Sequence, residues 1–169
     1  AMAHVAAMKA LTFLDLSWTY IQDRGLELLK GLENLKSLDL GGLRITAEGL
    51  AHLKGLKNLR VLNLNHTRAT DELVSVVAEI PSIEHLSLGS ASLTSAGLTA
   101  LTKMPNLEWL SLRAMVAKRS VWAALPEILP QIETLQYVDF RSATFPADLW
   151  KAVTEELRRR MPDTQIQGY

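Results

Sequence analysis

A leucine pattern recurs along nearly the whole chain, and it constrains the fold more than any other feature of the sequence. The pattern is Leu-x-x-Leu-x-Leu, with Ile, Val or Phe in some slots, and its copies start at residues 11, 35, 59, 83, 107 and 135. The first five starts are spaced by 24 residues, and the sixth follows after 28. A fixed period of this size predicts a solenoid, because each unit buries its apolar side only against its neighbours.

Each repeat combines the periods of two kinds of secondary structure. The fourth and sixth positions alternate as in a strand, whereas Leu26, Leu29 and Leu32 are spaced by three, as on one face of a short helix. The sequence therefore predicts a unit of strand, turn, helix and return.

Signals for the ends of the helices agree with this division. Thr46, Thr70 and Thr94 stand where a helix N-cap is needed. Pro81 and Pro105 follow two of the predicted helices and stop them.

The full motif L-x-x-L-x-L-x-x-T-x-I-T-x-x-G-L-x-x-L resembles the bacterial 24-residue leucine-rich repeats over roughly residues 1–160. It is also similar to the cysteine-containing class of F-box proteins, although this chain has no cysteine. The resemblance implies an α/β fold, a right-handed horseshoe solenoid with a parallel sheet on the concave face and short helices on the convex face. It also implies protein binding, since such repeats serve many partners.

The chain departs from the family at the ninth position of the repeat, which is usually Asn or Cys. Here the position holds Thr19, Leu43, Thr67, Ala91, Met115 and Ala143. An asparagine ladder is absent, and we expect the turn after each strand to be held less uniformly than in the family.

We expect one domain over residues 1–169, with residues 1–10 as the helical half of a truncated or capping repeat. These residues match residues 49–58 when shifted by 48. We favour a fragment of a longer array over a capping helix. In that case the first strand is an exposed edge through which the chain can self-associate.

Residues 146–169 are predicted to form a C-terminal capping helix and tail, with a short seventh strand at residues 164–167. Arg158, Arg159 and Arg160 lie in the last turn of that helix, where the helix dipole favours cations. We interpret them as a solvated face, the alternative being a phosphate or nucleic-acid patch.

The last two units are longer and carry tryptophans in a leucine slot. Trp122 and Trp150 occupy the slot of Leu26, Leu50 and Leu98 and are predicted to be core residues. The four additional residues, around positions 126–134, predict a longer or kinked helical segment.

Strand residues between the leucines face the concave side, where we predict two partner-binding clusters. The C-terminal cluster comprises His85, Trp109, Tyr137, Arg113, Arg141 and Asp139. The N-terminal cluster comprises Phe13, Trp18, Asp15 and Asp39. Aromatic residues and arginine often carry interface energy. The alternative is that the aromatic residues serve only the strand propensity of the sheet.

The histidine, serine and aspartate residues that could form a catalytic or metal site are not predicted to lie close together. His85 and Ser87 share a face, but Asp139 lies two strands away, at about 10 Å laterally, which is too far for a triad. His66 and His85 lack a third metal ligand. We therefore predict no enzyme, no cofactor and no metal, with a hydrolase as a remote alternative.

Composition narrows the class of partner. The 18 Lys and Arg residues balance the 18 Asp and Glu residues, so nucleic acid is not expected. The longest uncharged run, residues 86–102, contains seven Ser or Thr residues and is not a membrane span. We predict a protein–protein interaction module or scaffold, or alternatively the recognition part of a ubiquitin ligase or of an effector. The absence of cysteine and of a signal-peptide pattern favours the cytoplasm, or delivery into a host cell for an effector.

Overall fold

Seven short parallel strands lie side by side in chain order and form one open sheet. The computed structural model describes residues 2–168 of the chain. The strands are β1 (Phe13–Asp15), β2 (Ser37–Asp39), β3 (Val61–Asn63), β4 (His85–Ser87), β5 (Trp109–Ser111), β6 (Tyr137–Asp139) and β7 (Gln165–Gln167). Equivalent repeat positions pair across the sheet, as Leu38 does with Leu62, so the register follows the sequence period.

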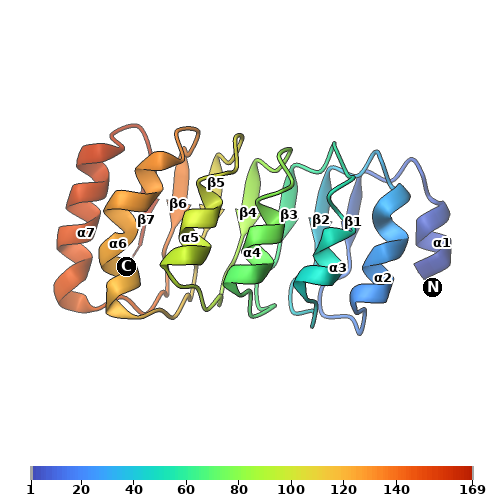
Figure 1. Ribbon diagram of the computed structural model, residues 1–169, viewed down its shortest axis with the longest axis horizontal. Helices are drawn as coiled ribbons and strands as arrows, with labels where there is room; N and C mark the ends of the chain where they lie inside the picture. Colours follow the sequence, from blue (N-terminus) through green and yellow to red (C-terminus); the bar gives the residue numbers. More distant parts are fainter. Residues whose placement is uncertain (1, 169) are drawn as a thin grey trace.

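A row of helices covers one face of this sheet (Figure 1). The helices are α1 (Met2–Ala7), α2 (Asp23–Glu27), α3 (Ala47–Ala51), α4 (Asp71–Val77), α5 (Ser95–Leu101), α6 (Arg119–Ile128) and α7 (Ala147–Arg160). Short 3-10 turns, η1 (Leu28–Gly31) and η2 (Leu129–Gln131), extend α2 and α6. The other face, which we call the open face, is free of helices. The predicted leucine-rich-repeat solenoid is confirmed.

The core lies between the sheet and the helices and is a continuous column of aliphatic side chains. Leu26, Leu50 and Leu98 are fully buried, as is Trp122 in the same slot. Trp150 is only half buried and packs against this core; it lies on α7, the last helix of the row (Figure 1). The core prediction is thus confirmed for Trp122 and confirmed only in part for Trp150.

Both ends of the described chain have the predicted secondary structure. Residues 2–7 are helical, residues 165–167 add the seventh strand, and α6 with η2 makes the longer helical segment around Pro126. The first and last residues of the predicted domain, 1 and 169, lie outside the described residues. The origin of the N-terminal helix in a longer array, and self-association through β1, stay predictions.

Two helix starts are joined to the preceding repeat by what we call a clasp. The carboxylate of Asp23 accepts hydrogen bonds from the backbone N (2.9 Å) and the Oγ (2.8 Å) of Thr46, which caps α3. A side chain at Gly49 would collide with Asp23, so the clasp needs a glycine there. The second clasp consists of Asp71, Thr94 and Gly97. The clasp therefore recurs after 48 residues, the length of two repeats.

The turn after each of the first six strands has the same left-handed backbone. The residues concerned are Trp18, Gly42, His66, Ser90, Ala114 and Ser142, with φ between 52° and 72°. In all six, the ninth-position N–H donates to the sixth-position carbonyl over 3.0–3.3 Å. The expectation of less uniform turns is therefore wrong for the backbone bond, which all six turns share. It is confirmed for the side chains, because only Thr19 and Thr67 add a bond from their own Oγ to the same carbonyl (2.6 and 2.7 Å).

None of the helices within residues 2–168 combines the length and apolar character that crossing a bilayer requires.

Candidate partner-binding face

Three aromatic rings form a stack on the open face, which we call the aromatic ladder. His85 on β4 lies 6.2 Å from Trp109 on β5, between ring centroids, at an interplanar angle of 19°. Trp109 lies 5.5 Å from Tyr137 on β6, with parallel rings. In-register strands place equivalent side chains about 4.8 Å apart, so adjacent aromatic residues must stack. The structure thus brings together the three rings of the predicted C-terminal cluster.

A shallow hollow of about 300 Å³ lies beside the aromatic ladder, and we call it the central hollow. Its lining comprises Phe13, Ser37, Leu38, Asp39, Val61, Asn63, His85, Ser87 and Trp109. Phe13, with 60% of its surface exposed, and His85 belong to different predicted clusters, yet both line this hollow. Val61 and Asn63 were missed by the sequence reasoning. The small side chain of Ser37 beside Phe13 was the available signal for a hollow.

Asp139 is enclosed by arginine, and its surface is inaccessible. Arg141 donates to its carboxylate from the backbone N (2.9 Å), Nε (3.0 Å) and Nη2 (2.8 Å). Arg113 Nε lies 3.9 Å from the same carboxylate. Burial alone would raise the pKa of Asp139, but the hydrogen bonds and charge of Arg141, with the charge of Arg113, outweigh it and lower the pKa. Asp139 therefore holds Arg141 in place, and a direct contact of Asp139 with a partner stays a prediction.

The other two carboxylates of this column also bind the turns that follow them. Asp15 accepts a hydrogen bond from the backbone N of Ser17 (2.8 Å), and the hydrogen bonds from Ser17 lower the pKa of Asp15. Asp39 accepts from Gly41 N and from Asn63 Nδ2, both at 2.8 Å. Asp15 nevertheless stays exposed and Asp39 half-exposed, so partner contact through them stays a prediction.

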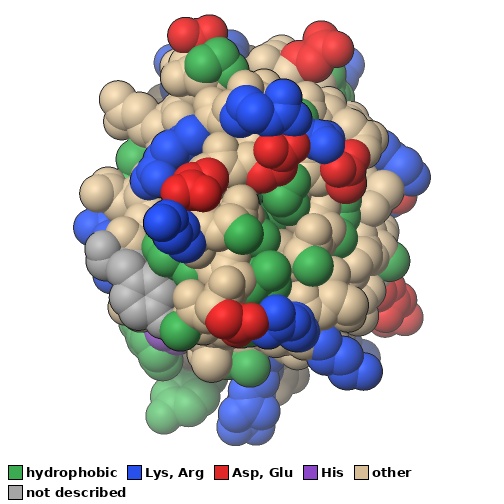
Figure 2. All heavy atoms as spheres, turned by 90° about the vertical axis from the view of Figure 1, so that its left-hand side faces the viewer, with side chains coloured by type: hydrophobic (Ala, Val, Ile, Leu, Met, Phe, Trp, Pro, Cys, Tyr) green, Lys and Arg blue, Asp and Glu red, His purple; other side chains and the backbone are tan. Residues whose placement is uncertain are grey.

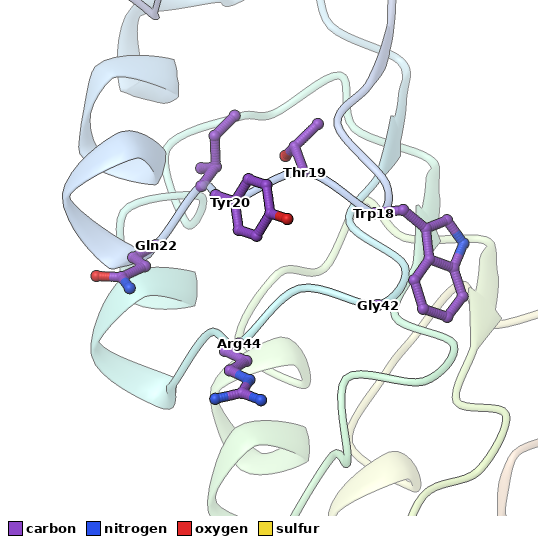
Figure 3. A pocket seen from close by; sticks show the side chains of 7 residues that line it. Trp18, Thr19, Tyr20, Gln22, Gly42 and Arg44 are labelled. Carbon is purple, nitrogen blue, oxygen red and sulfur yellow. The ribbon is translucent and has the colours of Figure 1, made fainter.

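Trp18 lies on the turn edge and not on the sheet. Its ring covers Gly42, where a Cβ would come within 2.6 Å of the indole, and its centroid is 5.6 Å from that of His66. His66 Nδ1 in turn lies 3.1 Å from Ser90 Oγ. On the helix side of Trp18 a broad pocket of about 510 Å³ opens, in which the Tyr20 ring points toward Trp18 (Figure 3). Sequence reasoning missed the exposed Tyr20.

The groups considered for chemistry do not converge. Asp139 is bonded to Arg141, and β5 separates it from His85 and Ser87 on β4. His66 lies on the turn edge, whereas His85 belongs to the aromatic ladder. Over residues 2–168, no three His, Cys, Asp or Glu side chains are grouped so that they could hold a metal ion.

Two of the three C-terminal arginines, Arg159 and Arg160, form ion pairs with acidic neighbours. Arg159 donates to Glu156, and Arg160 donates to both Glu156 and Glu127. These hydrogen bonds lower the pKa of Glu156 to about 2. Figure 2 views this end of the solenoid and shows blue Lys and Arg side chains beside red Asp and Glu side chains. The mixed charge supports the interpretation as a solvated face.

Known proteins share this repeat architecture. A family model described as Leucine Rich repeat matches residues 8–30, which include β1 and α2. No curated protein matches the chain. Among the 206 chains of solved structures that match, internalin C2 of Listeria monocytogenes superposes with a TM-score of 0.59 at 18% identity, over 97% of this chain and 76% of that chain. The motif, the strand register and these likenesses identify the chain as a leucine-rich-repeat protein in fold.

Proposed function

We propose that the chain is a protein-binding module that holds its partner on the open face of the sheet. The observation that carries this proposal is the aromatic ladder next to the central hollow. Three rings present their edges in one row, and the hollow beside them accepts a protruding apolar side chain.

Physical chemistry favours a protein partner at this place. Aromatic rings bury large apolar areas and lose little conformational entropy when they bind, so they dominate many interfaces. Here the rings are already held in place by their stacking. Tyr137 Oη also donates to Gln167 Oε1 (3.1 Å), which fixes the outer ring. A preorganised surface avoids part of the entropic cost of association.

A quantitative binding comparison tests the proposal. Proteins captured by the chain from its native source would be identified, purified, and titrated against the wild type and the W109A/Y137A double variant. We expect the double variant to lose at least about 30-fold in affinity, because two central hot-spot side chains are removed.

The matched control is Val116→Ala, which removes an exposed apolar side chain away from the open face. It should leave the affinity within about twofold. Circular dichroism melting would verify that both variants are folded. Retention of full affinity by the folded W109A/Y137A variant, for every partner, would refute the proposal.

A further inference from the structure

A second hollow lies at the turn edge, beyond the ends of the strands, and its lining is polar and includes one arginine. It measures about 220 Å³, and we call it the donor hollow. Its polar lining residues are Asn65, His66, Ser90, Arg113 and Ser142. His66 Nδ1 and Ser90 Oγ pair with each other (3.1 Å), and Asn65 Oδ1 accepts from Gly89 N (2.6 Å). No Asp or Glu of the described chain lines it. Such a lining suits a negatively charged group.

Arg113 is the cation that this part of the molecule does not need for its own neutralisation. Arg141 makes the hydrogen bonds to Asp139, whereas Arg113 only approaches the same carboxylate to 3.9 Å. Two arginines thus face one carboxylate, which leaves one positive charge in excess. The Arg113 side chain is 54% exposed, so it can turn to a ligand while Asp139 keeps its bonds to Arg141.

The position of Arg113 relative to the aromatic ladder sets a distance for the ligand. Trp109 and Arg113 lie on one chain segment, four residues apart, at the beginning of β5 and just beyond its end. Along an extended backbone four residues span about 13 Å. A partner segment that runs along the strand would meet both sites with side chains four positions apart.

We infer that the donor hollow binds the carboxylate of an Asp or Glu side chain in an extended partner segment. This inference rests on the proposed function. An apolar or aromatic residue four positions away in that segment covers the aromatic ladder. The planar guanidinium of Arg113 grips a carboxylate through two parallel hydrogen bonds. The hydroxyl of Ser142, which also lines the hollow, adds a neutral donor.

Charge favours an acidic protein segment over a nucleic acid. Tight phosphate-backbone binding uses several Lys or Arg contacts in a row. The donor hollow supplies only Arg113 as a permanent cation, and the chain as a whole is neutral. One uncompensated arginine matches one carboxylate.

Selection from a displayed library of random dodecapeptides tests this inference. On the wild-type protein we expect enrichment of Asp or Glu four positions from an aromatic or large apolar residue. On Arg113→Gln the apolar preference should remain and the acidic preference should vanish. Arg158→Gln, an exposed arginine on α7, is the matched control and should select the same peptides as the wild type.

A double-mutant cycle with a selected peptide measures the contact directly. Replacing the acidic residue of the peptide by its amide should weaken binding to the wild type about tenfold, as the loss of a charge-assisted hydrogen-bonded pair does. The same replacement should change binding to Arg113→Gln by less than about twofold.

The outcomes separate this inference from the proposed function. If no peptide is enriched, or if the acidic preference survives in Arg113→Gln, the inference is wrong. The proposed function is then still decided by the affinity comparison with W109A/Y137A. If selected peptides bind W109A/Y137A as tightly as the wild type, the role of the aromatic ladder is refuted.

Discussion

Asp15 and Asp139 occupy the same position in the first and the sixth repeat, yet one is exposed and the other is inaccessible. Each accepts a hydrogen bond from the backbone N–H two residues later. They differ in the side chains around them. Ser17 follows Asp15, whereas Arg141 follows Asp139 and Arg113 approaches from the preceding repeat. The repeat therefore sets the backbone contact of a residue, and its lateral neighbours set its exposure.

The exposure of the aromatic side chains on the open face also depends on their lateral neighbours. Phe13 has Ser37 as its neighbour in the sheet and stays 60% exposed. Trp109 stands between His85 and Tyr137 and is half buried by their rings. The N-terminal half of the open face thus offers an isolated ring beside a hollow, while the C-terminal half offers a continuous stack.

The largest effect is expected in the core of the C-terminal half. Trp122→Ala should lower the free energy of unfolding by about 3–5 kcal/mol, because a fully buried ring leaves a cavity. The indole also loses its contacts with Phe145 (4.3 Å between centroids) and Phe140 (6.4 Å). Urea denaturation followed by far-UV circular dichroism measures the loss. The N-terminal counterpart, Leu26→Ala, should cost about 3 kcal/mol, and a larger loss there would reverse the expected order of the two halves.

The second prediction tests whether the two aspartates differ in their contribution to stability. Asp139→Asn should destabilise the protein by about 2 kcal/mol, since it leaves a buried amide beside two arginines; their partial exposure reduces the penalty below that of a fully buried pair. Asp15→Asn should change stability much less than Asp139→Asn, as exposed substitutions do. Equal losses of unfolding free energy for the two variants in urea denaturation would show that the side chains of neighbouring repeats do not affect the contribution of these aspartates.

The third prediction concerns the turn under Trp18. Gly42→Ala should destabilise the protein by about 1–2 kcal/mol, because a Cβ is strained at φ +72° and displaces the indole. Gly55→Ala is the matched control, because a Cβ there meets no heavy atom within 4 Å. Thermal unfolding of both variants measures the difference. A neutral Gly42→Ala variant would mean that Trp18 does not pack on this turn in solution.

The smallest effect is a change in pH dependence. The folded-state pKa of Asp139 lies below its ordinary value of 3.8, so its stabilising contribution is complete at neutral pH and is lost as pH falls below about 4. Glu156, with a pKa of about 2, acts in the same direction. The melting temperature of the wild type should therefore fall with acidification through this range, and that of Asp139→Asn should fall less steeply. Parallel curves for the two proteins would contradict the role of Asp139.

Local patterns in the sequence are sufficient to predict most of the fold. The leucine period predicts the strands, because only one register buries all the leucines, and Thr46, Thr70 and Thr94 cap the helices as expected. The seventh strand follows from Ile166 in the fourth position of its unit. Each of these features depends on contacts that repeat in every unit.

The arrangement of the site was less predictable, because it depends on side chains from different repeats. The central hollow exists because Ser37 and Val61 are smaller than the flanking Phe13 and His85. The burial of Asp139 required knowing where the flexible Arg113 and Arg141 side chains point, which no period encodes.

The clasp between Asp23 and Thr46 defines the step by which such an array can be lengthened or shortened. Since the clasp recurs only in alternate repeats, removing residues 35–58 would place two like helix starts side by side. Asp23 would then face Thr70, but Leu73 would stand in the slot where the clasp needs a glycine. Removing or duplicating 48 residues would keep every carboxylate opposite its threonine and glycine. In spite of the 24-residue period of its leucines, the modular unit of this protein is therefore a pair of repeats.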